Sequence, residues 1–171
     1  MRVFVALALP VVVAAHADRA LAPVQALHPR LRWVPPERWH LTLAFHGEVP
    51  DDRVPAMAAK LGRRVSRHGP MVLHLHGSGH FSRRALWLGV DGDVGPLRSL
   101  ARDVTSDNSP FRAHLTVARI RGAVDPVPAQ EALSSYSGPT WVADSVHLVR
   151  SRLGPSPTYD DVASWPLVPR S

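Results

Sequence analysis

One short pattern occurs twice in this chain, and it constrains the architecture more than any other feature. Segment 40–44 reads HLTLA and segment 114–118 reads HLTVA, so both follow the pattern His-Leu-Thr-hydrophobic-Ala. Each copy is an apolar strand that leads toward a helix-bearing segment. Self-similarity of this kind predicts that the chain consists of two related halves.

The order of residues within each copy separates a polar face from an apolar one. Successive side chains of a strand point to opposite sides, so His40 and Thr42 share one face while the intervening leucine lies on the other. The second copy places His114 and Thr116 in the same way. If approximate two-fold symmetry relates the halves, both polar pairs converge on one cleft.

Two imidazoles and two hydroxyls in one cleft suit acid–base chemistry on a phosphodiester. Histidine has an unperturbed pKa of about 6.5 and can accept or donate a proton near neutrality. Each threonine hydroxyl can donate a hydrogen bond to a phosphate oxygen. One H-x-T alone would be weak, because both residue types tolerate half-buried strand faces. A merely duplicated core would repeat the leucines rather than the polar face, so the two copies favour function.

The remaining pattern predicts an α+β fold, with antiparallel sheets because several strands follow one another directly. A chain of 171 residues that is 45% hydrophobic is sufficient for one compact domain, residues 1–171. Gly77, Ser78 and Gly79 predict a turn. Strands are expected over 2–9, 31–34, 40–45, 71–76, 85–90, 113–120, 142–150 and 158–167, and helices over 11–27, 54–65, 94–104 and 126–135.

The N-terminus imitates a secretory signal, because an apolar run is followed by Ala15-His16-Ala17. Only one arginine precedes the run, Pro10 interrupts it, and the helical pattern continues past Asp18. We therefore expect a buried strand and then a helix opened by Pro10, in a cytoplasmic protein without a membrane anchor.

Composition narrows the chemistry further. The formal net charge is +6, which suits a phosphate-bearing partner without requiring one. Cysteine is absent, which excludes disulfides, thiolate metal sites and cysteine nucleophiles. Neither a metal nor another cofactor is expected.

Two alternatives stay open on the residues alone. The same cleft could bind RNA ends or phosphate without turnover. A metal-dependent hydrolase could instead use His74, His76 and His80, although no third ligand has convincing spacing. His46 shares a face with His40 by parity, so it could line the rim of the cleft or simply end the strand.

The paired motifs and their flanks resemble the 2H phosphoesterase superfamily and, within it, the RNA 2′,3′-cyclic phosphodiesterases, also called RNA 2′,5′-ligases, of bacteria and archaea. The resemblance covers nearly the whole chain. It rests on MRVFVALALP, RWVPPERWHLTLAFHGEV, FRAHLTVARIR and SRLGPSPTYDDVASWPL.

The resemblance implies a bilobal, pseudo-two-fold fold of antiparallel sheets that line a central cleft, with the helices outside. It also implies metal-independent hydrolysis of RNA 2′,3′-cyclic phosphate ends, tRNA fragments among them, to 2′-phosphates by a monomer. His40 would donate a proton to the departing O3′, and His114 would accept one from water. Thr42 and Thr116 would hold the non-bridging oxygens. The reverse reaction would form a 2′-5′ linkage.

Arg119 is a further candidate for binding the phosphate, and Arg121 is a weaker one. In an uninterrupted strand Arg119 lies on the face opposite to His114, so it reaches the phosphate only if a bulge or the end of the strand redirects it. A surface ion pair is the competing role. The segment RDVTSDNSPFRA before His114 is short for the resembled family, which bears on which RNA ends fit.

Overall fold

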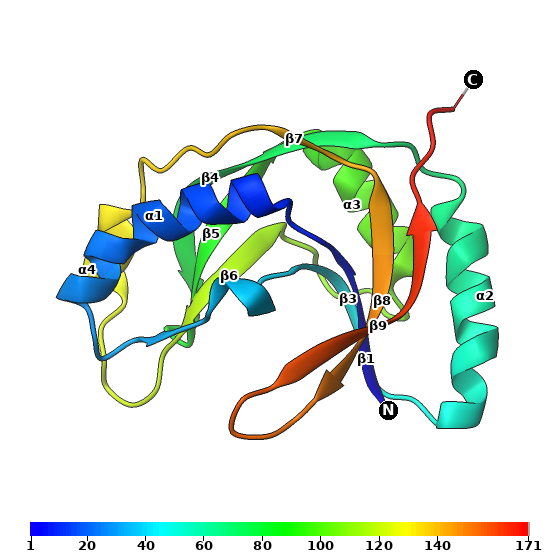
Figure 1. Cartoon of the computed structure of the whole chain (residues 1–171), viewed down its shortest axis with the longest axis horizontal. Helices are drawn as coiled ribbons and strands as arrows, with labels where there is room; N and C mark the ends of the chain where they lie inside the picture. The colour runs from blue at the N-terminus through cyan, green and yellow to red at the C-terminus, as the bar shows by residue number, and fades with distance from the viewer. Residues whose placement is uncertain (171) are drawn as a thin grey trace.

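In a computed structural model that describes residues 1–170, nine strands form two antiparallel sheets (Figure 1). The four-stranded sheet has the order β3-β1-β8-β9 and the five-stranded sheet the order β2-β6-β5-β4-β7. The strands are β1 (Arg2–Leu7), β2 (Arg32–Trp33), β3 (Leu41–Glu48), β4 (Met71–Phe81), β5 (Ala85–Gly92), β6 (His114–Arg119), β7 (Trp141–Ala143), β8 (Ser145–Arg152) and β9 (Thr158–Pro166). The predicted α+β class with antiparallel sheets is confirmed.

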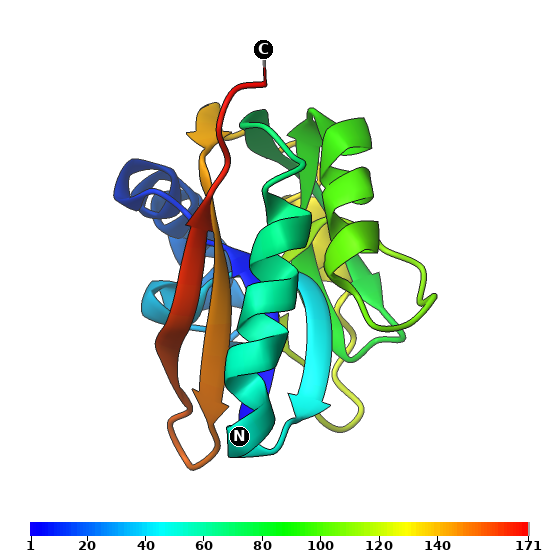
Figure 2. The same cartoon turned by 90° about the vertical axis from the view of Figure 1, so that its right-hand side faces the viewer.

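Helices pack on both sheets. They are α1 (Val11–Leu27), α2 (Val54–Val65), α3 (Val94–Val104) and α4 (Val127–Ala132), with short 3₁₀ turns at Pro36–Arg38 and Asp51–Arg53. Figure 2 shows α2 over the outer face of the four-stranded sheet. α3 packs against α2 and β3, and α4 packs against β4.

The N-terminal apolar run forms β1, an inner strand of its sheet between β3 and β8. Val3, Val5 and Leu7 pack in the main core, whereas Phe4 and Ala6 belong to a small apolar cluster on the opposite face. A strand buried on both faces reads as a continuous apolar run. The prediction of a strand followed by a helix is therefore confirmed. Among residues 1–170, no helix is long and apolar enough to cross a bilayer.

One motif strand lies in each sheet, and the apolar face of each strand packs in the core. Leu41 and Leu43 of β3 are buried, as are Leu115 and Val117 of β6. Truncating a buried leucine of this kind typically costs about 2–5 kcal/mol of the free energy of unfolding. The apolar half of each motif therefore holds the polar half in position.

The predicted turn at Gly77–Gly79 is wrong, because β4 continues through it to Phe81. Its pairing with β5 shifts register between Leu75 and Ser78, so the glycines mark a bulge. The turn lies further on, at Ser82 and Arg83, whose φ angles are 48° and 55°. Ser82 and Arg83 are the central residues of a turn that the Arg84 amide closes by donating to the Phe81 carbonyl at 2.8 Å. Two successive positive φ angles define the type I′ turn that hairpins favour.

The single strand predicted over 142–150 is also wrong. β7 pairs with β4 in the five-stranded sheet, whereas β8 pairs with β1 and β9 in the other sheet. The chain crosses between sheets at Asp144, whose carbonyl accepts a hydrogen bond from the Leu167 amide at 2.8 Å. Strand periodicity did not reveal this crossing because apolar residues continue on both sides of it.

Candidate active site

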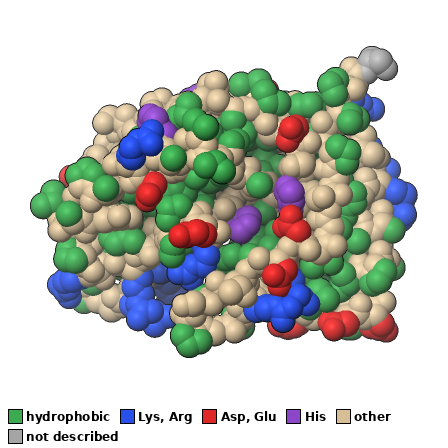
Figure 3. Space-filling view, viewed as in Figure 1, with side chains coloured by type: hydrophobic (Ala, Val, Ile, Leu, Met, Phe, Trp, Pro, Cys, Tyr) green, Lys and Arg blue, Asp and Glu red, His purple; other side chains and the backbone are tan. Residues whose placement is uncertain are grey.

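A cleft of about 630 Å³ lies between the two sheets, and we call it the central cleft. Its walls include His40, Thr42, His114 and Thr116, so the residues predicted from the repeat do converge on one cavity. Figure 3 shows histidine side chains in the central hollow of this face and basic side chains near its lower opening. The lining also includes Arg38, Phe45, Phe81, Arg119, Arg121 and Tyr159.

Both motif histidines are oriented by the same local hydrogen bond. Nδ1 of His40 lies 3.2 Å from the Arg38 carbonyl oxygen, and Nδ1 of His114 lies 2.7 Å from that of Arg112. A carbonyl can only accept, so each Nδ1 carries a hydrogen and donates it. Nε2 of each ring is then left for proton transfer.

Both motif strands also contain a bulge at the same position. In β3, Thr42 pairs with Ala6 and Ala44 with Val5, which leaves Leu43 without a partner. In β6, Thr116 pairs with Trp87 and Ala118 with Leu86, which leaves Val117 without a partner. The duplication therefore extends from the side chains to the backbone irregularity.

The bulge reverses the alternation of side chains downstream of each threonine. Arg119 is exposed and lies in the wall of the central cleft with Thr116. The bulge therefore turns Arg119 to the face of His114, which is the condition that the sequence analysis set for it to reach the cleft. Phe45 occupies the equivalent position in the first motif and also lines the cleft, with 68% of its surface exposed. An arginine and an aromatic ring thus occupy matching positions.

The bulge also explains why His46 does not line the central cleft. Regular alternation had placed His46 on the same face as His40, and the bulge reverses that alternation. β3 has a second register shift at this residue, between the pairs of Phe45 and Gly47. His46 Nε2 lies 2.9 Å from the Val104 carbonyl, to which it donates at the C-terminus of α3. Its role is to tie β3 to that helix.

The two motif histidines have different neighbours. The His40 ring makes edge contacts with Phe4 and Tyr159, at centroid distances of 5.6 and 5.2 Å. The pKa of His40 is lowered, chiefly by burial. The hydrogen bond to the Arg38 carbonyl and the charge of Asp161 act to raise this pKa, and the charge of His147 acts to lower it. Asp161 Oδ2 itself accepts a hydrogen bond from His147 Nδ1 at 2.9 Å.

His114 lies among aromatic rings and arginines instead. Phe81 meets it edge-on at 4.8 Å, and the ring of Trp87 is 6.2 Å away. Burial lowers the pKa of His114, and the charges of Arg119 and Arg112 lower it further. The Arg112 guanidinium lies 4.8 Å from the centre of the Trp87 ring, a cation–π contact.

Trp87 can lie across β4 only because Gly79 has no side chain. A Cβ at Gly79 would meet the indole ring of Trp87 at less than contact distance. The glycine thus supports the aromatic floor beneath His114, a role that its interpretation as a turn residue did not capture.

The histidines proposed as metal ligands do not come together with a third ligand. The rings of His74 and His76 are neighbours at 5.8 Å. His80 Nδ1 accepts a hydrogen bond from the Arg83 amide at 3.3 Å. Within residues 1–170, no three His, Cys, Asp or Glu side chains form a group suited to a metal.

Several residues around the two histidines were missed in the sequence, although a signal for two of them was present. Arg38 and Arg112 each stand two residues before a motif histidine, so the repeat is R-x-H-L-T-h-A rather than H-L-T-h-A. Tyr159 and Asp161 come from a strand far along the chain and carry no such signal.

Comparisons with known proteins agree with this fold and site. The family model described as LigT like Phosphoesterase matches residues 7–87. A relative from Thermus thermophilus, named RNA 2′,3′-cyclic phosphodiesterase, is 31% identical over 182 aligned positions that cover 93% of this chain and 86% of the relative. A relative of the same name from Geobacillus stearothermophilus is 30% identical over 80% of this chain, but the match spans only 48% of that relative, about half its length.

Solved structures show the same architecture. Escherichia coli LigT complexed with 3′-AMP superposes with a TM-score of 0.78 at 26% identity over 97% of both chains. The crystal structure of a Thermus thermophilus protein gives a TM-score of 0.74 at 27% identity over 98% of both chains. The chain therefore belongs to the LigT-like phosphoesterases of the 2H superfamily.

Proposed function

We propose that this protein hydrolyses the 2′,3′-cyclic phosphate at the 3′ end of RNA and leaves a 2′-phosphate. The observation that carries the proposal is the paired arrangement in the central cleft. There, two histidines with anchored Nδ1 atoms lie beside two threonines, and the same local backbone presents each pair.

The relatives support the choice of substrate. Those from T. thermophilus and G. stearothermophilus both carry the name RNA 2′,3′-cyclic phosphodiesterase. E. coli LigT has been crystallised with 3′-AMP, a nucleotide whose phosphate is on the 3′ oxygen of the ribose. The chain carries an excess of arginine around the cleft, which suits a phosphodiester.

The reaction needs one proton removed and one delivered. A water attacks phosphorus while His114 Nε2 takes its proton, and the new P–O bond forms. The P–O3′ bond breaks, and His40 Nε2–H protonates the departing O3′. The product has a 2′-phosphate and a free 3′-hydroxyl, and solvent returns both histidines to their starting states. General acid–base groups placed in this way each contribute about 10²- to 10⁴-fold in rate.

The charges around the two rings support this division of roles. A general acid must start protonated, and Asp161 favours the protonated form of His40. A general base must start neutral, and Arg119 with Arg112 favours the neutral form of His114. Burial lowers the pKa of both rings, so it is the difference in their charged neighbours that favours this division of roles.

Threonine and arginine side chains supply the remaining contacts in this proposal. The hydroxyls of Thr42 and Thr116 donate to the non-bridging oxygens, and Arg119 holds the charge that develops on them. Donors placed before the reaction starts stabilise the transition state without reorganisation.

Further parts of the proposal concern the reverse reaction and the cellular context. A 2′-hydroxyl of a second RNA in place of water would give a 2′-5′ linkage by the same proton transfers. The proposed substrates are RNA fragments with cyclic phosphate ends, including those of tRNA, and the proposed enzyme is a cytoplasmic monomer.

The test is incubation with adenosine 2′,3′-cyclic phosphate in excess chelator, followed by chromatographic identification of the monophosphate isomer. We expect adenosine 2′-phosphate at a rate that the chelator does not change. A 3′-phosphate product would reverse the assigned bond cleavage. Binding without turnover would instead indicate a non-catalytic RNA-end binder.

A further inference from the structure

A second cavity of about 1000 Å³ adjoins the central cleft and is not needed for the reaction itself. The two cavities share Thr42, Phe45, Phe81 and His114 in their walls. The second cavity runs along β3, an edge strand of its sheet, and is closed on the other side by α3 and the segment 105–112. We call it the arginine groove, since its walls include Arg64, Arg67, Arg98, Arg102 and Arg112.

These arginines form no ion pair with a carboxylate among residues 1–170, whereas three arginines outside the groove, Arg83, Arg150 and Arg152, do. Arg150 and Arg152 both bind Asp160, at 3.0 and 2.8 Å. In the groove, Arg64 donates to the Asp103 carbonyl at 2.9 Å, and Arg112 stacks on an indole ring. The guanidinium charges of the groove therefore remain available to an anion.

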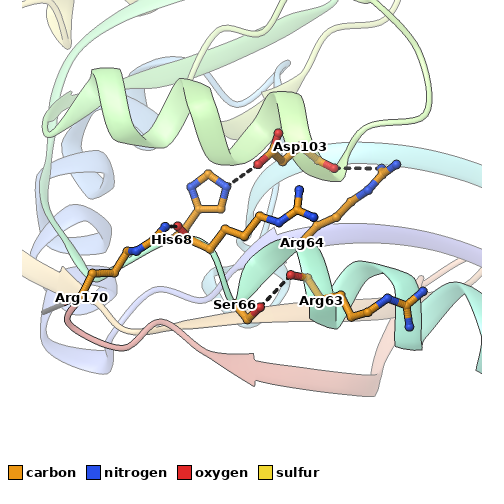
Figure 4. A network of polar contacts seen from close by, with 7 residues as sticks. Arg63, Arg64, Ser66, His68, Asp103 and Arg170 are labelled. Carbon is orange, nitrogen blue, oxygen red and sulfur yellow. Dashed lines mark hydrogen bonds and ion pairs between the residues drawn. The ribbon is translucent and has the colours of Figure 1, made fainter.

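The two acidic residues in the groove wall are already engaged. Asp103 Oδ2 lies 2.7 Å from His68 Nε2, and Figure 4 shows Asp103 between His68 and Arg64. Asp107 Oδ1 accepts the Ser109 amide at 2.9 Å, within its own loop. Neither carboxylate neutralises the arginines opposite.

Helix dipoles explain only part of this charge. Arg64 lies in the last turn of α2 and Arg102 in the last turn of α3, where cations are favoured by the partial negative charge. Arg98 lies one turn earlier in α3, on the same face as Arg102, and Arg112 lies outside any helix. The dipoles therefore do not explain the positions of Arg98 and Arg112.

Aromatic rings mark the junction between the two cavities. Phe45 is 68% exposed and Phe81 37% exposed, and both rings line both cavities. Exposed aromatic rings followed by a basic groove are the combination that binds single-stranded nucleic acid, because bases stack on the rings while the phosphates track the charges.

We propose that the arginine groove holds the RNA strand upstream of the reacting end. This inference rests on the proposed function, since it takes the cyclic phosphate to lie between His40 and His114. The last bases stack on Phe45 and Phe81, and the preceding phosphates lie against Arg98 and Arg102. The preferred substrates are therefore single-stranded oligoribonucleotides, and free cyclic nucleotides are poorer ones.

The experiment compares kcat/KM for a hexaribonucleotide that ends in a 2′,3′-cyclic phosphate with kcat/KM for adenosine 2′,3′-cyclic phosphate. We expect the wild-type protein to prefer the hexanucleotide. In the double variant Arg98→Gln/Arg102→Gln, the ratio of the two kcat/KM values should fall by on the order of tenfold, as expected for the loss of two exposed charge contacts. For the hexanucleotide, the slope of log(kcat/KM) against the logarithm of the salt concentration should be shallower by about 1.4 in this variant, because two phosphate contacts are lost.

The matched control is Arg19→Gln/Arg63→Gln, which removes two exposed helical arginines that lie in neither cavity. It should keep the wild-type ratio. A groove variant with the wild-type ratio would overturn the inference. The same conclusion would follow if Arg32→Gln/Arg121→Gln, in the central cleft, abolished the preference while the groove variant kept it.

A binding measurement separates failure of this inference from failure of the proposed reaction. Fluorescence anisotropy with a labelled hexanucleotide 3′-phosphate needs no turnover. We expect the groove variant to bind it about tenfold more weakly than the control does. Equal affinities would overturn the groove inference whatever the protein does to a cyclic phosphate, whereas weakened binding without any turnover would overturn the reaction alone.

Discussion

The two halves of the candidate active site share one backbone arrangement but differ in their charged neighbours. Each half anchors a histidine through Nδ1 to the carbonyl two residues earlier, and each contains a bulge one residue after its threonine. The neighbours that are not repeated make the difference, because Asp161 lies near one ring and Arg119 near the other. The repeat thus sets the shared geometry, and the charged neighbours that are not repeated underlie the proposed division into acid and base.

Removing either motif histidine should have the largest effect on activity. We expect His40→Ala and His114→Ala each to lower kcat by about 10²-fold or more, because each deletes one proton transfer. The control is His76→Ala, which removes an exposed histidine outside both cavities. Wild-type kcat in a folded variant of either motif histidine would contradict the two-histidine mechanism.

Arg119→Gln should have the next largest effect, and it should alter only the half of the site that contains His114. Loss of a charged hydrogen bond to the phosphate typically costs about 1.5–3 kcal/mol, so kcat/KM should fall at least about tenfold. The charge of Arg119 lowers the pKa of His114, so its removal raises that pKa. The base must be neutral, and the ascending limb of the profile of kcat/KM against pH should move to higher pH. A limb that stays in place would show that Arg119 does not act on His114.

Gly79→Ala tests the support beneath the second half. The added methyl would meet the Trp87 ring, so the indole must move from under His114. Overpacking of this kind costs about 1–3 kcal/mol of the free energy of unfolding, measurable by urea denaturation. Gly95→Ala is the control, because a Cβ there meets nothing within 4 Å. Equal stability of the two variants would contradict the packing role of Gly79.

Asp161→Asn should have the smallest effect and should alter the first half alone. The charge of Asp161 raises the pKa of His40, so its removal lowers that pKa. The acid must be protonated, and the descending limb of the profile of kcat/KM against pH should therefore move to lower pH, with the ascending limb unchanged. Movement of the ascending limb instead would assign the base to His40.

The fold was predictable where a strand or helix has a regular pattern. α1 was predicted at its observed bounds, and β1 was recognised despite its likeness to a signal peptide. The crossing at Asp144 was missed, because which sheet a strand joins depends on contacts between distant segments rather than on local periodicity. The glycines 77–79 misled because a bulge and a turn both favour glycine.

The site was predictable to the extent that it is repeated. The repeat identified His40, Thr42, His114 and Thr116, which the structure brings together in one cleft. It could place Arg119 only conditionally, because a bulge depends on pairing with a neighbouring strand. Asp161 and the groove arginines belong to segments that approach the site only in the folded chain.

The division into acid and base is tested most directly with a cyclic substrate whose bridging O3′ is replaced by sulfur. A thiol has a pKa near 8.5, far below that of an alcohol, so the departing sulfur needs no proton. We predict that this substrate restores most of the activity lost in His40→Ala and none of that lost in His114→Ala. Restoration of His114→Ala instead would contradict the assignment.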